Sequence, residues 1–94
     1  MLPFKHVDGE DRGKIKFIGL STCGWCRRTR QLLDKLSVAY DYVYVDQLTP
    51  DEQKQAMDEV RRWNPGESFP TIIFDDSSCV LGFDEAKIRA AVGK

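Results

Sequence analysis

Two cysteines three positions apart, Cys23 and Cys26, are the residues whose spacing points most directly to chemistry in this 94-residue chain. They lie in the stretch Ser-Thr-Cys-Gly-Trp-Cys, which follows an apolar run at 15–20 and precedes a helix-like pattern at 27–36. A Cys-x-x-Cys pair between a strand and a helix is typical of a dithiol that opens and closes by disulfide exchange. The spacing therefore predicts a redox-active centre in which both cysteines are catalytic.

The predicted helix explains why Cys23 should be the nucleophile. Three residues along a helix rise about 4.5 Å, so the two sulfurs come within disulfide reach if Cys23 lies at the first turn. Free backbone N–H groups and the positive end of the helix favour a thiolate there. Ser21 or Thr22 is expected to cap the helix. Arg27 and Arg28 add electrostatic support if their side chains turn back toward the sulfur.

The residues between and after the first cysteine complete the predicted reaction. Cys26, one turn into the helix, is expected to be buried and to stay a thiol until it attacks the mixed disulfide formed at Cys23. Gly24 leaves the approach to the sulfur open. Trp25 is expected beside the sulfurs, either as a contact for the substrate or as a partly exposed packing residue.

A zinc site is the alternative use of these cysteines. Three cysteines are an odd count, which excludes a complete disulfide framework. Cys79 and His6 could bring the number of zinc ligands to four, but only in a fold that breaks the strand–helix pattern, so we favour the dithiol. Cys79 is then a small apolar residue of a hairpin, and His6 is a surface histidine.

Two strands and a helix surround the dithiol in the predicted fold. Residues 14–20 are expected to form a central strand buried on both faces. Residues 38–46 form a second strand, because they are rich in β-branched and aromatic types. The helix between these strands makes a right-handed parallel crossover.

The second half of the chain carries the signals of two helices and a hairpin. Thr49, Pro50 and Glu52 mark a helix start through a capping box and a first-turn proline. Apolar runs at 69–74 and 79–81 flank a polar turn and predict a hairpin, and Asp84 is a plausible cap for the last helix. The order β-α-β-α-β-β-α predicts an α/β fold, a four-stranded mixed sheet with helices on both faces.

The chain length and net charge limit the number of domains and the kinds of partner that the chain can have. The chain is long enough for one domain, predicted at 14–94, behind an extension at 1–13 in which residues 2–7 form a candidate extra strand. Net charge is −1, with 14 basic and 15 acidic residues, and this balance argues against nucleic-acid or membrane-surface binding. There is no apolar run of membrane-spanning length and no signal core, so a cytoplasmic location is expected.

The chain resembles the glutaredoxins of the thioredoxin-fold superfamily over residues 14–94. The resemblance rests on the Cys-Gly-Trp-Cys motif, on Ser-Phe-Pro at 68–70 and on Gly-Phe-Asp-Glu at 82–85. It implies a thioredoxin-like fold, a disulfide reductase, and a cis peptide bond before Pro70, which faces the dithiol. The backbone of Phe69 would then pair with the substrate chain like an added strand.

The resemblance also implies a groove that binds glutathione. Phe69 would hold its cysteinyl part, and Asp84 and Glu85 at the start of the last helix would meet its γ-glutamyl end. Two departures affect this groove. Leu20 stands where the family often has lysine, with Arg27 or Lys16 as candidate replacements for the charge, and Leu-Gly at 81–82 stands where a glycine pair is usual.

Gly24 replaces a proline that is common in the family, and this departure implies an alternative function. Some glutaredoxins without that proline hold a [2Fe–2S] cluster between two chains with glutathione, where Cys23 of each chain would be a ligand. The leading hypothesis remains a monomeric reductase that requires no cofactor. Its partners would be a disulfide-containing protein or small molecule and an electron donor, which is glutathione or a reductase.

Overall fold

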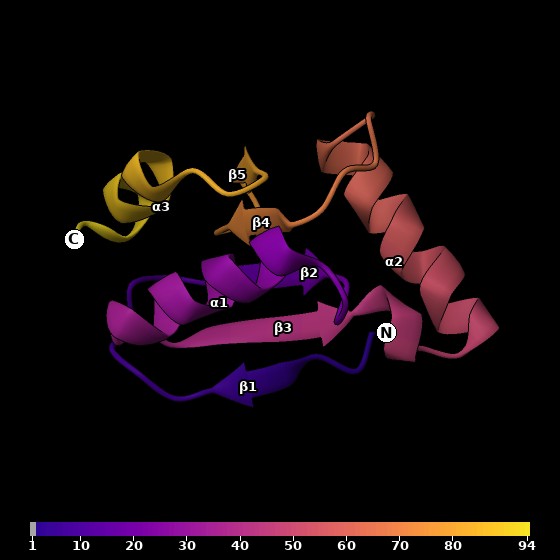
Figure 1. Ribbon diagram of the computed structural model, residues 1–94, viewed down its shortest axis with the longest axis horizontal. Coiled ribbons are helices and arrows are strands. Elements are labelled where there is room, and N and C mark those ends of the chain that lie inside the picture. The colour runs from indigo at the N-terminus through magenta and orange to yellow at the C-terminus, as the bar shows by residue number, and fades with distance from the viewer. Residues whose placement is uncertain (1) are drawn as a thin grey trace.

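The computed structural model describes residues 2–94 as one five-stranded sheet with three α-helices (Figure 1). The elements in chain order are β1 (Lys5–Val7), β2 (Ile15–Gly19), α1 (Gly24–Lys35), β3 (Tyr40–Tyr44), a short 3-10 helix η1 (Val45–Gln47), α2 (Pro50–Trp63), β4 (Thr71–Phe74), β5 (Ser78–Leu81) and α3 (Glu85–Val92). The strand order across the sheet is β1-β3-β2-β4-β5. The predicted order of elements is confirmed, with the extra strand in front.

The central strand is β2, and the dithiol follows its carboxyl end. β2 runs parallel to β3, with Ile18 opposite Val43, and antiparallel to β4, with Ile18 opposite Thr71. Phe17 and Ile18 are both fully buried and belong to different core clusters, one on each face of the sheet. The prediction of a central strand buried on both faces is therefore confirmed.

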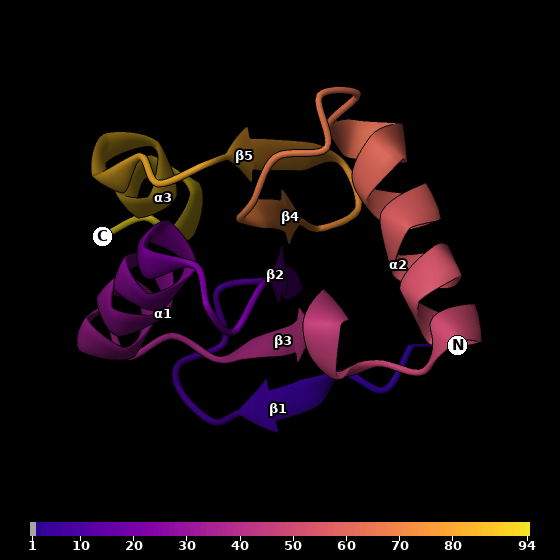
Figure 2. The same cartoon turned by 45° about the vertical axis from the view of Figure 1, so that its right-hand side comes forward.

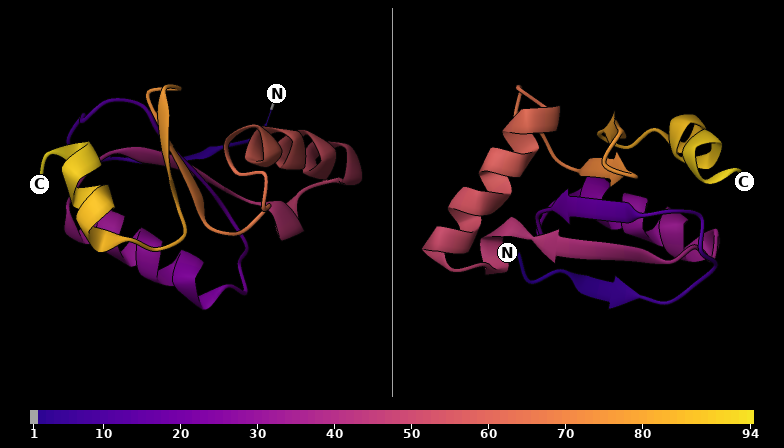
Figure 3. Two further views of the ribbon diagram at one scale, coloured as in Figure 1. Left: turned by 90° about the horizontal axis from the view of Figure 1, so that it is seen from above. Right: turned by 180° about the vertical axis from the view of Figure 1, so that it is seen from behind.

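Helices cover both faces of this sheet. α1 and α3 share one face, where Leu33 and Ile88 pack in a core with Phe17. α2 covers the other face, where Val60 packs with Ile18. Figure 2 shows α2 apart from the α1–α3 pair, and the view from above in Figure 3 shows the strands between them. Each face thus has its own apolar core.

Arg30 anchors α1 to β3. Its guanidinium carbon lies 3.7 Å from the centre of the Tyr42 ring. Its Nε donates to the Tyr40 hydroxyl at 3.1 Å, and one terminal nitrogen donates to the Tyr44 hydroxyl at 2.9 Å. These three tyrosines alternate along β3 and therefore face the same side of the sheet. The contacts fix the position of the helix that begins at the dithiol.

The strand predicted at 38–46 is shorter in the structure. β3 covers Tyr40–Tyr44 only, and the chain then turns into η1. The last pair between β3 and β2 is Tyr44 with Gly19. Because β2 ends there and the chain leaves for the dithiol, later residues have no partner strand on that side. The β propensity of the residues after Tyr44 is therefore not enough to extend β3, because the neighbouring strand β2 has already ended.

The boundaries of the other helices follow their predicted caps. The Thr49 hydroxyl accepts from the Glu52 N–H at 3.3 Å, and the Glu52 carboxylate accepts from the Thr49 N–H at 3.0 Å. Asp84 caps α3 by accepting from the Lys87 N–H at 3.1 Å. Gly93 ends α3 in the left-handed conformation, with φ of 74°. Both capping predictions are confirmed.

β1 joins the sheet along β3, so part of the extension at 1–13 is built into the same sheet. His6 lies opposite Asp41 in the antiparallel pair, and the His6 Nδ1 is 2.8 Å from the Asp41 carboxylate. Asp8 lies 3.1 Å from the His6 Nε2. His6 is an exposed surface residue, as expected. The fold places two acidic residues beside it, and the sequence analysis did not identify them as its partners.

His6 generates a prediction about pH. The hydrogen bond that His6 donates to Asp41, followed by the charges of Asp41 and Asp8, raises the pKa of His6 above 6.5. Because the folded-state pKa is the higher one, the stabilisation is present below the unfolded value of about 6.5 and is lost as the pH rises through the folded-state pKa. NMR titration of the imidazole should show a raised pKa that falls toward 6.5 in Asp41→Asn. An unchanged pKa in that variant would contradict the assignment.

Candidate active site

Cys23 occupies the N-cap position of α1. Its backbone is extended, with φ of −87° and ψ of 119°, and its Sγ accepts a hydrogen bond from the Cys26 N–H at 3.3 Å. The sulfur therefore lies at the positive end of the helix, where a thiolate is stabilised. The side chain of Cys23 is half-buried and keeps one side open to solvent.

The prediction that Ser21 or Thr22 caps the helix is wrong. α1 begins at Gly24, so the cap position falls on Cys23 itself. Ser21 has a different partner: its N–H donates to the Asp46 Oδ1 at 2.9 Å, and its hydroxyl donates to the Asp46 Oδ2. These bonds lower the pKa of Asp46. They tether the loop before the dithiol to η1, a link between residues 25 positions apart in sequence.

Cys26 lies in an environment opposite to that of Cys23. It is fully buried, and the Leu20 N–H donates to its Sγ at 3.5 Å. Burial raises the pKa of the Cys26 thiol to about 12, and the hydrogen bond and charge of Cys23 add to that effect. Cys26 is therefore held as a neutral thiol while Cys23 faces solvent, which agrees with the predicted division of roles.

Gly19 makes room for the Cys26 sulfur, a role that the sequence analysis missed. A Cβ built on Gly19 would lie 2.9 Å from the Cys26 Sγ and 2.8 Å from the Phe17 ring. A Cβ on Gly24, by contrast, would meet nothing within 4 Å. The two glycines therefore differ: Gly19 is required by close packing, and Gly24 leaves open space beside Cys23. A glycine at the end of a buried strand is the sequence signal for such close approach.

The Phe69–Pro70 peptide bond is cis, as the resemblance implied. Pro70 is buried, and its carbonyl accepts from the Gly82 N–H at 2.8 Å. Phe69 and Cys23 pack against the same core cluster. In the described chain, the N–H and C=O of Phe69 form no hydrogen bond. They are therefore free to pair with an added strand.

Trp25 turns toward α3. Its ring stacks on Phe83, with centroids 5.8 Å apart and planes 21° apart. The Arg28 guanidinium carbon lies 5.4 Å from the centre of the Trp25 ring. Trp25 keeps 57% of its surface exposed, so it presents a partly exposed aromatic ring two residues from Cys23. Sequence reasoning did not identify Phe83 as its partner.

The two arginines predicted to support Cys23 electrostatically lie close to it in sequence but do not contact its sulfur. Arg28 covers the Trp25 ring. Arg27 is exposed, and within residues 2–94 neither guanidinium forms a hydrogen bond to Cys23. The Cys26 N–H is therefore the group that donates a hydrogen bond to the Cys23 sulfur in the structure.

Two acidic residues predicted for glutathione have structural partners. The Asp84 Oδ1 accepts from the Lys87 N–H as the cap of α3. The Glu85 carboxylate accepts from the Arg89 Nε at 2.9 Å, an ion pair within α3. Both lie at the start of the helix that the resemblance assigned to the groove.

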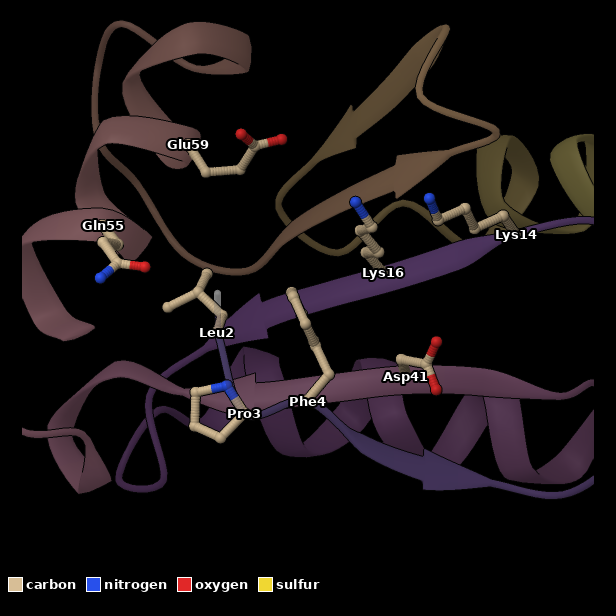
Figure 4. A pocket seen from close by; sticks show the side chains of 8 residues that line it. All are labelled: Leu2, Pro3, Phe4, Lys14, Lys16, Asp41, Gln55 and Glu59. Atoms are coloured by element: carbon tan, nitrogen blue, oxygen red, sulfur yellow. The ribbon is translucent and has the colours of Figure 1, made fainter.

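Lys16 does not supply the charge missing at Leu20. It lies near the start of β2, whereas the dithiol follows the end of that strand. Its Nζ donates to Asp76 at 3.2 Å. Figure 4 shows Lys16 beside Phe4 in a cavity of about 580 Å³ on the α2 side of the sheet. Of the two candidate cations, only Arg27 belongs to the helix that carries the dithiol.

The zinc alternative does not fit the strand order. His6 is on β1 and Cys79 is on β5, and these strands are the two opposite edges of the sheet. The Cys79 Sγ lies 3.8 Å from the Trp63 carbonyl, half-buried in the hairpin as predicted. Among the described residues, no three His, Cys, Asp or Glu side chains converge where they could hold a metal ion.

Within residues 2–94, none of the helices has the length and apolar character needed to cross a bilayer.

Several solved structures that resemble this chain are glutaredoxins. The model of the glutaredoxin family matches residues 15–79. The chain is similar to the solved glutaredoxin of Methanosarcina mazei Go1, with 50% identity and a TM-score of 0.91 over 97% of this chain and 88% of that one. It is also similar to Methanosarcina acetivorans methanoredoxin, with 49% identity and a TM-score of 0.90 over 92% and 90%. A glutaredoxin from Archaeoglobus fulgidus matches at 28% identity and TM-score 0.81, over 87% and 88%. No curated protein matches the chain.

The two glycines around the dithiol provide a matched test of packing. Gly19→Ala should lower the free energy of unfolding by about 1–3 kcal/mol, because its Cβ overpacks against Cys26 and Phe17. Gly24→Ala should leave stability unchanged or raise it by up to ~1 kcal/mol, since alanine favours the helix and the space is open. Urea unfolding of the reduced proteins measures both. Equal stabilities would show that Gly19 is not a packing requirement.

The raised pKa of Cys26 predicts slow alkylation. In a Cys23→Ser, Cys79→Ser variant, Cys26 is the remaining cysteine. Its iodoacetamide rate at pH 8 should be at least tenfold below that of a free cysteine, because the buried thiol ionises only at much higher pH. The single-thiol variant that retains Cys23 is the control. Alkylation of native Cys26 as fast as free cysteine would contradict its burial and its raised pKa.

Proposed function

The chain belongs to the glutaredoxin family, and we propose that it is a dithiol disulfide reductase acting on protein or small-molecule disulfides. Membership of the family gives it a thiol oxidoreductase-like function. The observation that supports the more specific proposal is the contrast within the motif. Cys23 is half-exposed at a helix end, and Cys26 is buried three residues later with a raised pKa.

The first step is attack by the Cys23 thiolate on one sulfur of the substrate disulfide. A bond forms between Cys23 and that sulfur, the substrate S–S bond breaks, and the other substrate sulfur leaves as a thiolate. The Cys26 N–H stabilises the attacking anion through its hydrogen bond to Cys23. The open space at Gly24 leaves the sulfur accessible.

The second step is attack by Cys26 on the Cys23 sulfur. In the resting dithiol, burial and the neighbouring Cys23 sulfur keep the pKa of Cys26 high. Formation of the mixed disulfide removes the charge on Cys23, so one of the causes that raise this pKa is lost. Cys26 then loses its proton, forms the Cys23–Cys26 disulfide, and releases the second substrate thiolate. Two electrons and two protons pass from the protein dithiol to the substrate.

The substrate is proposed to lie between Phe69 and Trp25. The unpaired N–H and C=O of Phe69 support strand-like pairing with the substrate backbone, beside buried Pro70. For glutathione, the start of α3 with Asp84 and Glu85 would receive the γ-glutamyl end. Since both carboxylates already have partners, we propose that the free backbone of Phe69 contributes more to this binding.

The partners and setting follow from this chemistry. The oxidised protein must receive two electrons from glutathione or from a reductase before it can act again. A reducing compartment such as the cytoplasm would keep the pair in the dithiol form. The reaction described above needs one chain and no bound cofactor, so we propose a monomer.

A cluster-binding function is the second candidate, and Gly24 is the observation that favours it. Cys23 is half-buried, and a Cβ on the adjacent Gly24 would meet nothing within 4 Å, whereas Cys26 is buried and Cys79 lies on the edge strand β5. One chain therefore offers a single accessible thiol at this surface. A [2Fe–2S] cluster would need Cys23 from two chains and two further thiolates, such as those of glutathione.

Replacing each cysteine separately tests the reductase mechanism. Cys23→Ser should reduce turnover of a protein disulfide to the uncatalysed rate, because the nucleophile is gone. Cys26→Ser should stall as a covalent adduct whose mass equals protein plus substrate, since the resolving thiol is missing. Cys79→Ser is the matched control and should keep full activity. Full activity in Cys23→Ser would rule out this mechanism.

The electron donor and the cluster are tested with the same preparation. Glutathione with its reductase is compared with a thioredoxin reductase on one disulfide substrate, and the donor that sustains turnover is identified. Anaerobic isolation with glutathione should give a colourless monomer. A brown dimer whose absorption is lost in Cys23→Ser would support the cluster function instead.

A further inference from the structure

A groove of about 340 Å³ runs along the outer side of α1 and the start of α3. The residues that line it are Arg28, Gln31, Leu32, Lys35, Phe83 and Glu85. Trp25 lies at one end of the groove, because it stacks on Phe83 and is covered by Arg28. Figures 1 and 3 show the two helices on the same side of the sheet. The groove therefore starts two residues from Cys23 and leads away from it along α1.

The groove carries positive charge without a matching carboxylate. In the described chain, Arg28 and Lys35 form no ion pair. Glu85 is the acidic residue in the lining, and Arg89 pairs with it at 2.9 Å. Arg27, on the neighbouring stripe of α1, has no acidic partner either. This surface is cationic although the whole chain has a net charge of −1.

Many basic residues elsewhere form ion pairs within the chain. Lys14 and Lys16 share Asp76, and Arg61 pairs with both Asp58 and Glu67. Lys5, Lys54 and Lys87 also form no ion pair within residues 2–94, but they lie on three different elements. The α1 groove differs because unpaired cations are grouped on one helix there. Available cations beside a reactive centre attract an oppositely charged partner.

The spacing of these cations favours a chain over a small anion. Arg28 and Lys35 are seven residues apart, which is about 10 Å along the helix. Two carboxylates along a chain match this spacing better than one anion does. An extended peptide with two carboxylates can contact both cations, and Leu32 and Phe83 supply an apolar floor between them.

We propose that this groove docks the acidic flank of a protein substrate whose disulfide is attacked by Cys23. The proposal rests on the reductase function above and names the class of its protein substrates. Lys35 lies twelve residues after Cys23, or about 18 Å along α1. An extended chain covers roughly 3.3 Å per residue. The substrate should therefore carry one acidic residue about two positions from the reactive cysteine, facing Arg28, and another about five positions away, facing Lys35.

Three disulfide peptides test the proposal. They are identical except that the positions two and five residues from the cysteine, on both sides, hold glutamate, glutamine or lysine. The wild-type protein should reduce the acidic peptide with a kcat/KM about tenfold above that of the lysine peptide at low salt. This preference should shrink as salt is added. Equal rates for all three peptides would overturn the docking proposal.

Lys35→Gln and Lys54→Gln form a matched pair of variants. Both lysines are exposed on helices, and Lys54 lies on α2, across the sheet from the groove. Lys35→Gln should lower kcat/KM for the acidic peptide about threefold or more and leave the glutamine peptide unchanged. Lys54→Gln should change neither. The same loss in both variants would indicate a general charge effect and would overturn the proposal.

A binding measurement separates docking from catalysis. An acidic peptide with serine in place of cysteine cannot react, so its binding can be followed by NMR whether or not the protein is a reductase. Shifts at the amides of Gln31 and Lys35, absent with the lysine peptide, would support docking. No shift at these amides would overturn it. Failure to reduce even a small uncharged disulfide would instead count against the proposed function.

Discussion

The hydrogen bond from the Cys26 N–H to the Cys23 sulfur is the interaction on which the site depends. At 3.3 Å it makes the Cys23 side chain the cap of α1. The first N–H groups of a helix have no partner within the helix, and here one of them is used to hold a sulfur. The same contact therefore starts the helix and places the Cys23 sulfur at its positive end. In the proposed reaction, the contact that caps the helix is also the one that holds the attacking sulfur.

The rest of the fold creates a steep change in environment over three residues. Cys23 stays at the surface, while Cys26 enters the core between α1 and the end of β2, where Gly19 leaves space for its sulfur. Arg30 holds α1 against β3 through three tyrosines, so the helix cannot easily turn its buried thiol outward. Burial then raises the pKa of the Cys26 thiol. The proposed reaction depends on this difference in burial for the order in which the two thiols act.

Segments far from the motif in sequence complete the surface around it. Asp46 holds Ser21 in the loop before the dithiol, and the cis peptide at Phe69–Pro70 belongs to the chain leading into β4. Phe83 comes from the start of α3 and supports Trp25. Three segments from different parts of the chain thus meet near the two sulfurs. The placement follows the general tendency of sites in α/β proteins to gather at the carboxyl ends of central strands.

Local spacing in the sequence was enough to determine the Cys-x-x-Cys pair, the order of elements and two of the three predicted helix caps, those at Thr49 and Asp84. Each of these signals depends on residues a few positions apart, so helix and strand geometry alone converts it into structure. The tertiary structure alone decided that Cys23 caps its own helix, that Gly19 faces the Cys26 sulfur, and that β3 stops where β2 ends. These features depend on contacts between segments tens of residues apart or on the exact residue where a helix begins. Such contacts are set by the packing of the whole sheet, which no short stretch of sequence encodes.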